Sequence, residues 1–199
     1  MDDIVRQAMT KWPNVPHCFG WLRLDARGYW RMRDTYAQEN DLPGTRIDHA
    51  TLIGFINRNY GGDDTGRWFF QNGPQRVYVD LELTPYIVRT DPTADLKLHT
   101  DEPLQPTAAW LTERGQLLLA SPDKVATLDD RDGAALFSGL HCAGEHASEE
   151  QVLQWLDGST SVQLEWRRGN LILPVQRIDS HSLETHFKFV AQPRADETA

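Results

Sequence analysis

The 199-residue chain has few cysteines, no long apolar run and a shortage of positive charge. Only Cys18 and Cys142 are present, which is too few for a disulfide framework in a chain of this length. A cytoplasmic protein with reduced thiols is therefore the expectation. The longest apolar segment, residues 171–175, has the length of a strand and falls far short of the roughly 18 residues of a spanning helix. The first residues also lack the basic and apolar regions of a secretory signal.

The balance of charge argues against two classes of partner. The chain has 20 Lys and Arg against 29 Asp and Glu, which gives a formal net charge of −9. Surfaces that bind nucleic acid are basic, and anionic membranes attract basic segments. The sequence therefore predicts that neither nucleic acid nor a membrane is a partner, and it leaves the oligomeric state open.

Diagnostic catalytic motifs are missing as well. The sequence contains no phosphate-binding glycine-rich loop with a lysine, no dinucleotide fingerprint and no nucleophile elbow. An EF-hand loop around residues 130–133 fails because Leu128 and Gly139 occupy positions that must hold ligands. Asp80 and Glu82 can be read as a catalytic carboxylate pair, but a solvated sheet face is the favoured interpretation. No catalytic residue and no cofactor is predicted.

What the chain does have is a repeated pattern. Residues 21–30 and residues 110–119 each read as a strand, an Arg-Gly turn and a second strand. Each is followed by an amphipathic helix and by another glycine-centred hairpin, at Gly73 and at Gly169. The period of about 90 residues is too long for a solenoid and predicts paired α+β units. The low identity between the copies leaves open whether they are a true duplication or two common hairpins.

Local signals place several elements along the chain. Helices are predicted over residues 2–12, over residues 48–60 with Asp48 as the N-cap, and over residues 148–158, where Ser-Glu-Glu-Gln forms a capping box. Residues 35–44 are polar and are predicted to be a loop. Strict alternation over residues 76–83 predicts a half-buried antiparallel strand, and a last strand is expected around Phe187 and Phe189.

These elements predict an α+β protein of two related units, each a small antiparallel sheet with a covering helix. Acidic residues and prolines make residues 100–107 the best linker candidate. The predicted domains are an N-terminal unit with a leading helix over 1–100, a C-terminal unit over 108–193 and a polar, disordered tail over 194–199. The units are expected to pack together because each alone is marginal in size.

The densest group of potential metal ligands is His141, Cys142, Glu145 and His146. Three residues separate the first histidine from the Glu-His pair, whereas the inverted zinc-peptidase pattern has two. On a helix, positions five apart diverge too far to share an ion. A polar loop with a partly buried cysteine is the favoured interpretation, and a metal-dependent hydrolase using this cluster is the alternative function.

Cys18 is a second reactive candidate. His17 precedes it, and a neighbouring imidazole can lower the pKa of a thiol. A small core residue at the start of a strand is the favoured interpretation, because buried cysteine is common. A thiol redox role is kept as a third hypothesis for the chain.

Aromatic residues give the strongest functional indication. The chain has 7 Trp, and neighbouring aromatic residues on a strand face opposite sides, so not all of them can enter one core. Exposed aromatic surface indicates contact with another element, chain or ligand. The sequence therefore predicts a non-enzymatic binding or regulatory module that contacts a protein or a small apolar ligand. The predicted contact residues are Trp21, Trp30, Trp68 and Phe70.

Three runs of residues resemble a known family. HCFGWLRLDARG at 17–28, WFFQNGPQRVYVD at 68–80 and TPYIVRT at 84–90 look like an uncharacterised bacterial protein family, a domain of unknown function, over most of the chain. The order of hairpin, helix and Thr-Pro-containing strand is also distantly similar to another uncharacterised family built from repeated α+β motifs. The second resemblance implies a duplication, and neither implies catalytic residues.

Overall fold

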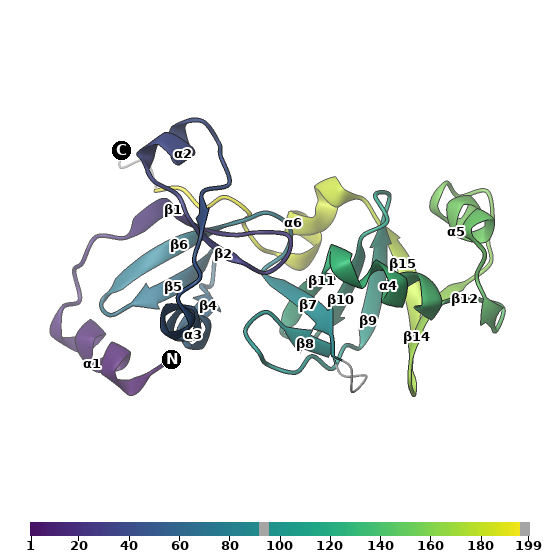
Figure 1. Cartoon of the computed structure of the whole chain (residues 1–199), viewed down its shortest axis with the longest axis horizontal. Coiled ribbons are helices and arrows are strands. Elements are labelled where there is room, and N and C mark those ends of the chain that lie inside the picture. The colour runs from purple at the N-terminus through teal and green to yellow at the C-terminus, as the bar shows by residue number, and fades with distance from the viewer. Residues whose placement is uncertain (92–95, 196–199) are drawn as a thin grey trace. The chain divides into compact units, whose positions relative to one another are not determined.

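The computed structural model describes residues 1–91 and 96–195, which form two compact units (Figure 1). The first unit consists of Met1–Pro85 together with the described residues from Phe187 onward, and the second is Tyr86–His186. Each unit has its own sheet and its own helices, so the α+β class with two units is confirmed. Among the described helices, none has both the length and the apolar character needed to cross a membrane.

The first unit is built around a mixed sheet. Its described strands lie in the order β3-β2-β1-β6-β5-β4, and all neighbours are antiparallel except the central pair β1 and β6. Three helices accompany the strands. The elements in chain order are α1 (Asp3–Lys11), β1 (Cys18–Leu24), β2 (Trp30–Met32), α2 (Thr35–Glu39), β3 (Thr45–Arg46), α3 (Ala50–Arg58), β4 (Tyr60–Gly62), β5 (Trp68–Asn72) and β6 (Gln75–Leu81).

The second unit has a longer mixed sheet, in the order β13-β12-β14-β15-β9-β10-β11-β7-β8. Its parallel pairs are β9 with β15 and β7 with β11. The elements are β7 (Tyr86–Thr90), β8 (Leu96–Leu98), β9 (Ala108–Thr112), β10 (Leu117–Ser121), β11 (Lys124–Leu128), η1 (Asp130–Asp132), α4 (Gly133–Gly139), β12 (Leu140–Cys142), β13 (Glu145–His146), α5 (Glu149–Leu156), β14 (Leu164–Arg168), β15 (Leu171–Ile178), η2 (Ser180–Ser182) and α6 (Leu183–Phe187).

The two sheets share one pattern of connections. The order β3-β2-β1-β6-β5-β4 of the first unit corresponds to β11-β10-β9-β15-β14-β12 of the second. In each, three antiparallel strands lead through a helix, α3 or α4, to three more, and the last strand runs parallel to the first. The predicted small antiparallel sheets are therefore mixed sheets, because the first and last strands of this six-strand pattern, β1 with β6 and β9 with β15, pair in parallel.

A five-residue turn closes three of the hairpins. Asp25, Asp63 and Thr112 each accept hydrogen bonds on a side-chain oxygen from the backbone N–H groups two and four residues later. The residue three positions on is a glycine with φ between 74° and 80° in every case, at Gly28, Gly66 and Gly115. Because this turn also occurs a third time inside the first unit, the repeated Arg-Gly pattern has a local cause.

The boundary between the units lies earlier than the predicted linker. Tyr86, Ile87 and Val88 of β7 pair with β11, and β8 pairs with β7, so residues 86–98 extend the second sheet. Residues 100–107 stay close to that sheet, since the Leu104 N–H donates to the Leu96 carbonyl. The pairing of β7 with β11 joins residues about 40 positions apart, and such a pairing has no local signal in the sequence. The prediction therefore relied on the prolines and acidic residues of 100–107 and placed the boundary there.

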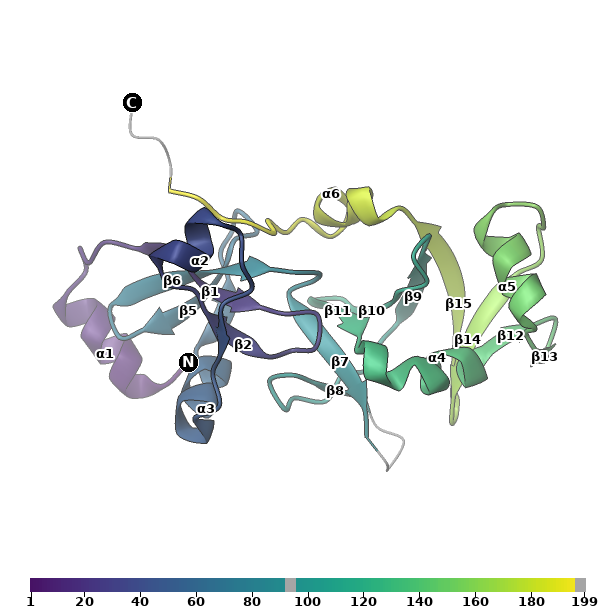
Figure 2. The ribbon, with the colours of Figure 1, turned by 45° about the horizontal axis from the view of Figure 1, so that its top comes forward.

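The helices predicted from local sequence signals agree with the structure only in part. The capping box at Ser148 is present, with both of its reciprocal hydrogen bonds. The N-cap before α3 is His49 rather than Asp48, and the expected loop at 35–44 includes the short helix α2. The last strand expected around Phe187 is instead helix α6, after which the chain returns beside β6 and the Leu81 N–H donates to the Ala191 carbonyl (Figure 2).

Candidate apolar binding site

An apolar groove opens in the first unit. A cavity of about 750 Å³ and a second of about 280 Å³ share the side chains of Met32, Ile47 and Leu52, and we call the two together the groove. The larger cavity is also lined by Asp34, Tyr36, Ala37, Leu42, Pro43, Gly44, Thr45 and Arg46. The smaller is also lined by Cys18, Trp21, Leu22, Ile56, Phe70, Asn72 and Val77.

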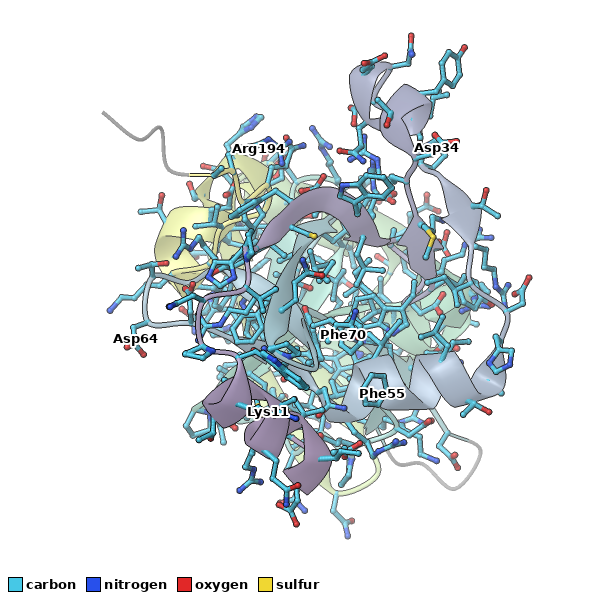
Figure 3. All side chains as sticks on the ribbon, turned by 90° about the vertical axis from the view of Figure 1, so that its left-hand side faces the viewer. Lys11, Asp34, Phe55, Asp64, Phe70 and Arg194 are labelled. Carbon is cyan, nitrogen blue, oxygen red and sulfur yellow. The ribbon has the colours of Figure 1, made fainter. Side chains whose placement is uncertain are left out.

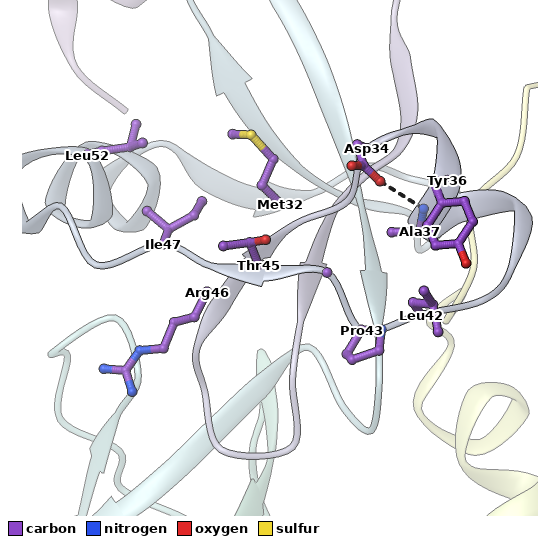
Figure 4. A pocket seen from close by; sticks show the side chains of 11 residues that line it. Met32, Asp34, Tyr36, Ala37, Leu42, Pro43, Thr45, Arg46, Ile47 and Leu52 are labelled. Carbon is purple, nitrogen blue, oxygen red and sulfur yellow. Dashed lines mark hydrogen bonds between the residues drawn. The ribbon is translucent and has the colours of Figure 1, made fainter.

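The groove has an inner side and an outer wall. Leu52 and Ile47 lie on one side, Met32 and Thr45 lie in the middle, and the segment 34–43 forms the opposite wall (Figure 4). On the inner side, Phe55 of α3 packs edge to face on Phe70 of β5, with ring centroids 5.4 Å apart (Figure 3). The helix α3 and the sheet thus fix the inner side, while the outer wall consists of the short helix α2 and the loop that follows it.

Large apolar side chains of the groove remain in contact with water. Met32 is 51% exposed and Tyr36 is 66% exposed, and Leu42 and Trp21 are exposed as well. Exposed apolar residues that gather around a concavity are typical of sites for ligands or partners, whereas scattered ones are common on any surface. The groove is therefore the strongest candidate site in the described part of the first unit.

The predicted aromatic contact residues separate into two groups. Trp21 and Phe70 both line the smaller cavity. Trp30 is only 2% exposed, and its Nε1 donates to Asn57 Oδ1 at 2.7 Å. Trp30 and the half-buried Trp68 each pack on the ring of Tyr60, with centroids 5.1 Å away. The structure thus brings Trp21 and Phe70 together at the groove and places Trp30 and Trp68 in an aromatic cluster around Tyr60.

The larger cavity depends on residues that sequence reasoning did not single out. Tyr36 and Leu42 come from the segment 35–44, which reads as polar and irregular, and Met32 is the last residue of β2. The available signal was a set of large apolar side chains inside a segment with no apolar periodicity. Exposed apolar side chains in such a segment mark a site more clearly than the strand aromatics do.

A buried ion pair lies behind the outer wall. The side chains of Arg33 and Asp80 are each only 4% exposed, and Arg33 Nη1 donates to Asp80 Oδ2 at 2.7 Å. Arg33 also donates to the Leu42 carbonyl at 3.0 Å, to the Ala37 carbonyl at 3.2 Å and to Asp41 Oδ1 at 3.0 Å. One guanidinium therefore ties α2 and the loop after it to Asp80 of the sheet.

The expectation that Asp80 lies on a solvated sheet face is wrong. Residues 78–81 are all buried, and the carboxylate of Asp80 is covered by the side chains of Arg33 and Arg194. Glu82, two residues further, is half-exposed and lies 3.5 Å from the Arg23 guanidinium. The burial of Asp80 is compensated by its arginine partners, which is the condition under which a charge is retained inside a protein.

The histidine cluster of the second unit adopts a hairpin. His141 of β12 lies opposite His146 of β13, with ring centroids 5.9 Å apart, and Cys142 lies opposite Glu145. His141 Nδ1 is 2.9 Å from the Gly139 carbonyl oxygen. In the described parts of the chain, no three His, Cys, Asp or Glu side chains come together in a way that could hold an ion. The geometry gives the predicted metal site no support.

Comparison with known proteins places the chain in a family. A family model named DUF2944, with the description "Protein of unknown function (DUF2946)", matches residues 1–194. The chain belongs to the DUF2944 family. The resemblance to an uncharacterised family is thereby confirmed, and membership of DUF2944 assigns no activity. A search of curated proteins found no match to this DUF2944 member.

Two solved structures are similar to this DUF2944 chain. A DUF1285 family protein from Silicibacter pomeroyi DSS-3 has 10% identity and a TM-score of 0.49, over 92% of this chain and 99% of that one. A DUF1285 family protein from Shewanella baltica OS155 has 11% identity and a TM-score of 0.35, over 56% of this chain and 86% of that one. At these scores neither similarity bears on the site.

Proposed function

We propose that the first unit is a binding module whose groove takes a small apolar ligand. The observation that carries the proposal is the exposure of Met32 and Tyr36 at a concave site with further apolar side chains around them. Covering such side chains removes apolar surface from water, which is the main driving force of apolar association. Cavities of about 300–1,000 Å³ are typical of small-molecule sites, and the larger part of the groove falls in this range.

The comparison between the two units supports the same location. The shared order of strands favours an origin by duplication. In the second unit, β10 and β11 are joined by a tight turn, because Ser121 pairs with Lys124. In the first unit, the corresponding strands β2 and β3 are separated by residues 33–44, which contain α2 and build the outer wall. The outer wall of the larger cavity is thus built by a segment that the corresponding turn of the second unit lacks.

The expected affinity is modest. Covering on the order of 300 Å² of apolar surface contributes roughly 7 kcal/mol, from which the cost of association must be subtracted. A binding assay must therefore reach protein concentrations of about a millimolar to detect a weak ligand.

The proposal is tested by placing a charge in the groove. The Met32→Glu protein is titrated into a fixed low concentration of the uncharged dye Nile red, and dye fluorescence is compared with the original chain. An apolar ligand that covers residue 32 must remove water from the introduced carboxylate, which is unfavourable. The affinity for the dye should therefore fall at least about tenfold. Its thermal midpoint should change little, because Met32 is already half in water.

A matched control lies in the second unit. Ile172 is 54% exposed on β15, so Ile172→Glu makes the same change at a similar exposure away from the groove. Dye binding should be retained in this variant. Equal binding by the original chain and both variants, or no binding by the original chain, would overturn the proposed site.

A further inference from the structure

The buried carboxylate of Asp80 has two arginine partners from different parts of the first unit. Its Oδ2 accepts from Arg33, which holds the outer wall of the groove. Its Oδ1 accepts from Arg194 Nη1 at 3.0 Å. Asp80 therefore joins the groove wall to the C-terminal segment.

The C-terminal segment is seated on the first unit before it reaches Asp80. The Val190 N–H donates to the Gly66 carbonyl, and the Ala191 carbonyl accepts from the Leu81 N–H at 2.7 Å. At Gly66 a Cβ atom would lie 2.3 Å from the Lys188 carbonyl oxygen, so the approach of the two backbones requires glycine. Arg194 itself is 57% exposed and can leave Asp80 without disturbing a core.

A polar cavity lies between the two arginines. It has a volume of about 330 Å³ and is lined by residues of both the outer wall and the C-terminal segment, including Gln38, Asp41 and Gln192. Water can therefore reach Asp80 Oδ1 when Arg194 is removed, and the carboxylate gains a solvated alternative to its position against Arg33. The hold of Arg33 on the Ala37 and Leu42 carbonyls depends on that position, because an arginine buried without its carboxylate is strongly unfavourable.

We propose that Arg194, Asp80 and Arg33 form a connected set of ion pairs, here called the relay. Through it, the C-terminal segment controls how well ordered the outer wall of the groove is. Arg33 and Asp80 are positioning residues in this scheme, and Arg194 regulates them. Only the consequence for ligand binding rests on the proposed function. The effect on the order of residues 34–44 exists without any ligand.

The relay is tested by hydrogen exchange of the full chain carrying Arg194→Ala, followed by mass spectrometry. Amide exchange in residues 34–44 should become about threefold to tenfold faster, since a charge-assisted hydrogen bond with one exposed partner is lost. Exchange in peptides from α3 and β5 should stay unchanged. Arg194→Lys should restore most of the protection, because an ammonium group can replace the charge beside Asp80.

Arg177→Ala provides the control, since Arg177 is an exposed arginine of the second unit that donates to the Thr160 carbonyl. It should leave exchange in residues 34–44 unchanged. The relay is overturned if Arg194→Ala leaves that exchange unchanged, or if it accelerates exchange evenly across the first unit. Failure of Nile red binding in the original chain would remove the proposed function and leave this result intact, so the two failures are distinguishable.

Discussion

Two charged residues, Arg33 and Asp80, form a buried ion pair in the first unit. Their hydrogen bond joins residues 47 positions apart, and local alternation in the sequence carries no trace of it. The alternation of β6 correctly predicts a strand, but on its second face Asp80 is covered by Arg33 and Arg194, which come from distant parts of the chain. Burial of a charge is set by tertiary partners, so the sequence could predict the strand and not the environment of Asp80.

The buried pair leads to a stability prediction. Asp80→Asn leaves the Arg33 guanidinium buried without its carboxylate, and the free energy of unfolding should fall by about 3–5 kcal/mol. Urea denaturation followed by circular dichroism measures the change. Asp64→Asn alters an exposed carboxylate of the same unit and should cost only a few tenths of a kcal/mol. Equal, small losses in both variants would show that the Arg33–Asp80 pair is not important for folding.

His99 of the second unit gives a prediction on pH. Burial, with a further contribution from the charge of Arg89, lowers the pKa of His99 to about 3. Its Nδ1 accepts from the Ile87 N–H, so the folded state holds the neutral ring. In the unfolded chain the pKa of His99 is about 6.5. The contribution of the neutral His99 ring to stability is therefore fully present above that pH and is lost as the pH falls toward about 3.

The measurement is the pH dependence of urea unfolding in the original chain and in His99→Gln. Between about pH 6 and pH 4, the free energy of unfolding of the original chain should fall with pH more steeply than that of the variant, by up to about 1.4 kcal/mol per pH unit. Parallel pH profiles of the two proteins would contradict a buried neutral His99.

At the scale of elements, short local signals were predicted well and non-local ones were not. The capping box before α5 and the glycine hairpins depend on contacts within a few residues, so the sequence alone specifies them. The assignment of β7 to the second sheet depends on pairing with β11, and α6 replaces the strand that the alternation of Phe187 and Phe189 predicted. The short helix α2 is too brief to show periodicity.

The recurring turn allows a matched test of backbone strain. Gly115 has a φ of 74°, Gly133 has a φ of −52°, and a Cβ atom at either would meet nothing within 4 Å. Gly115→Ala should therefore cost about 1–2 kcal/mol of stability from the left-handed conformation alone. Gly133→Ala, at the start of α4, should be neutral or stabilise by up to about 1 kcal/mol. Thermal unfolding compares them, and a similar effect of the two substitutions would be inconsistent with this account of the turn.

At the scale of the whole molecule, the common order of strands is the main regularity. The repeat of hairpin, helix and hairpin could be read from the sequence, because each part has a local signature. The parallel pairing of β1 with β6 and of β9 with β15 could not, since it joins strands more than 50 residues apart. The groove arises where the units differ, in the segment between β2 and β3, and the residues that line it were recognised only in part, through Trp21 and Phe70.

The central claim is that this groove binds an apolar ligand, and the two cysteines of the chain test it directly. Cys18 lines the smaller cavity, while Cys142 lies on β12 of the second unit, and both are half-buried. The rate at which each thiol reacts with a soluble disulfide reagent is measured with and without octanol, and Cys18→Ser and Cys142→Ser assign the two phases. Octanol should slow the reaction of the Cys18 thiol in proportion to the fraction of grooves that it occupies, and it should leave the reaction rate of Cys142 unchanged. Unchanged rates at both cysteines, or equal slowing of both, would contradict the claim.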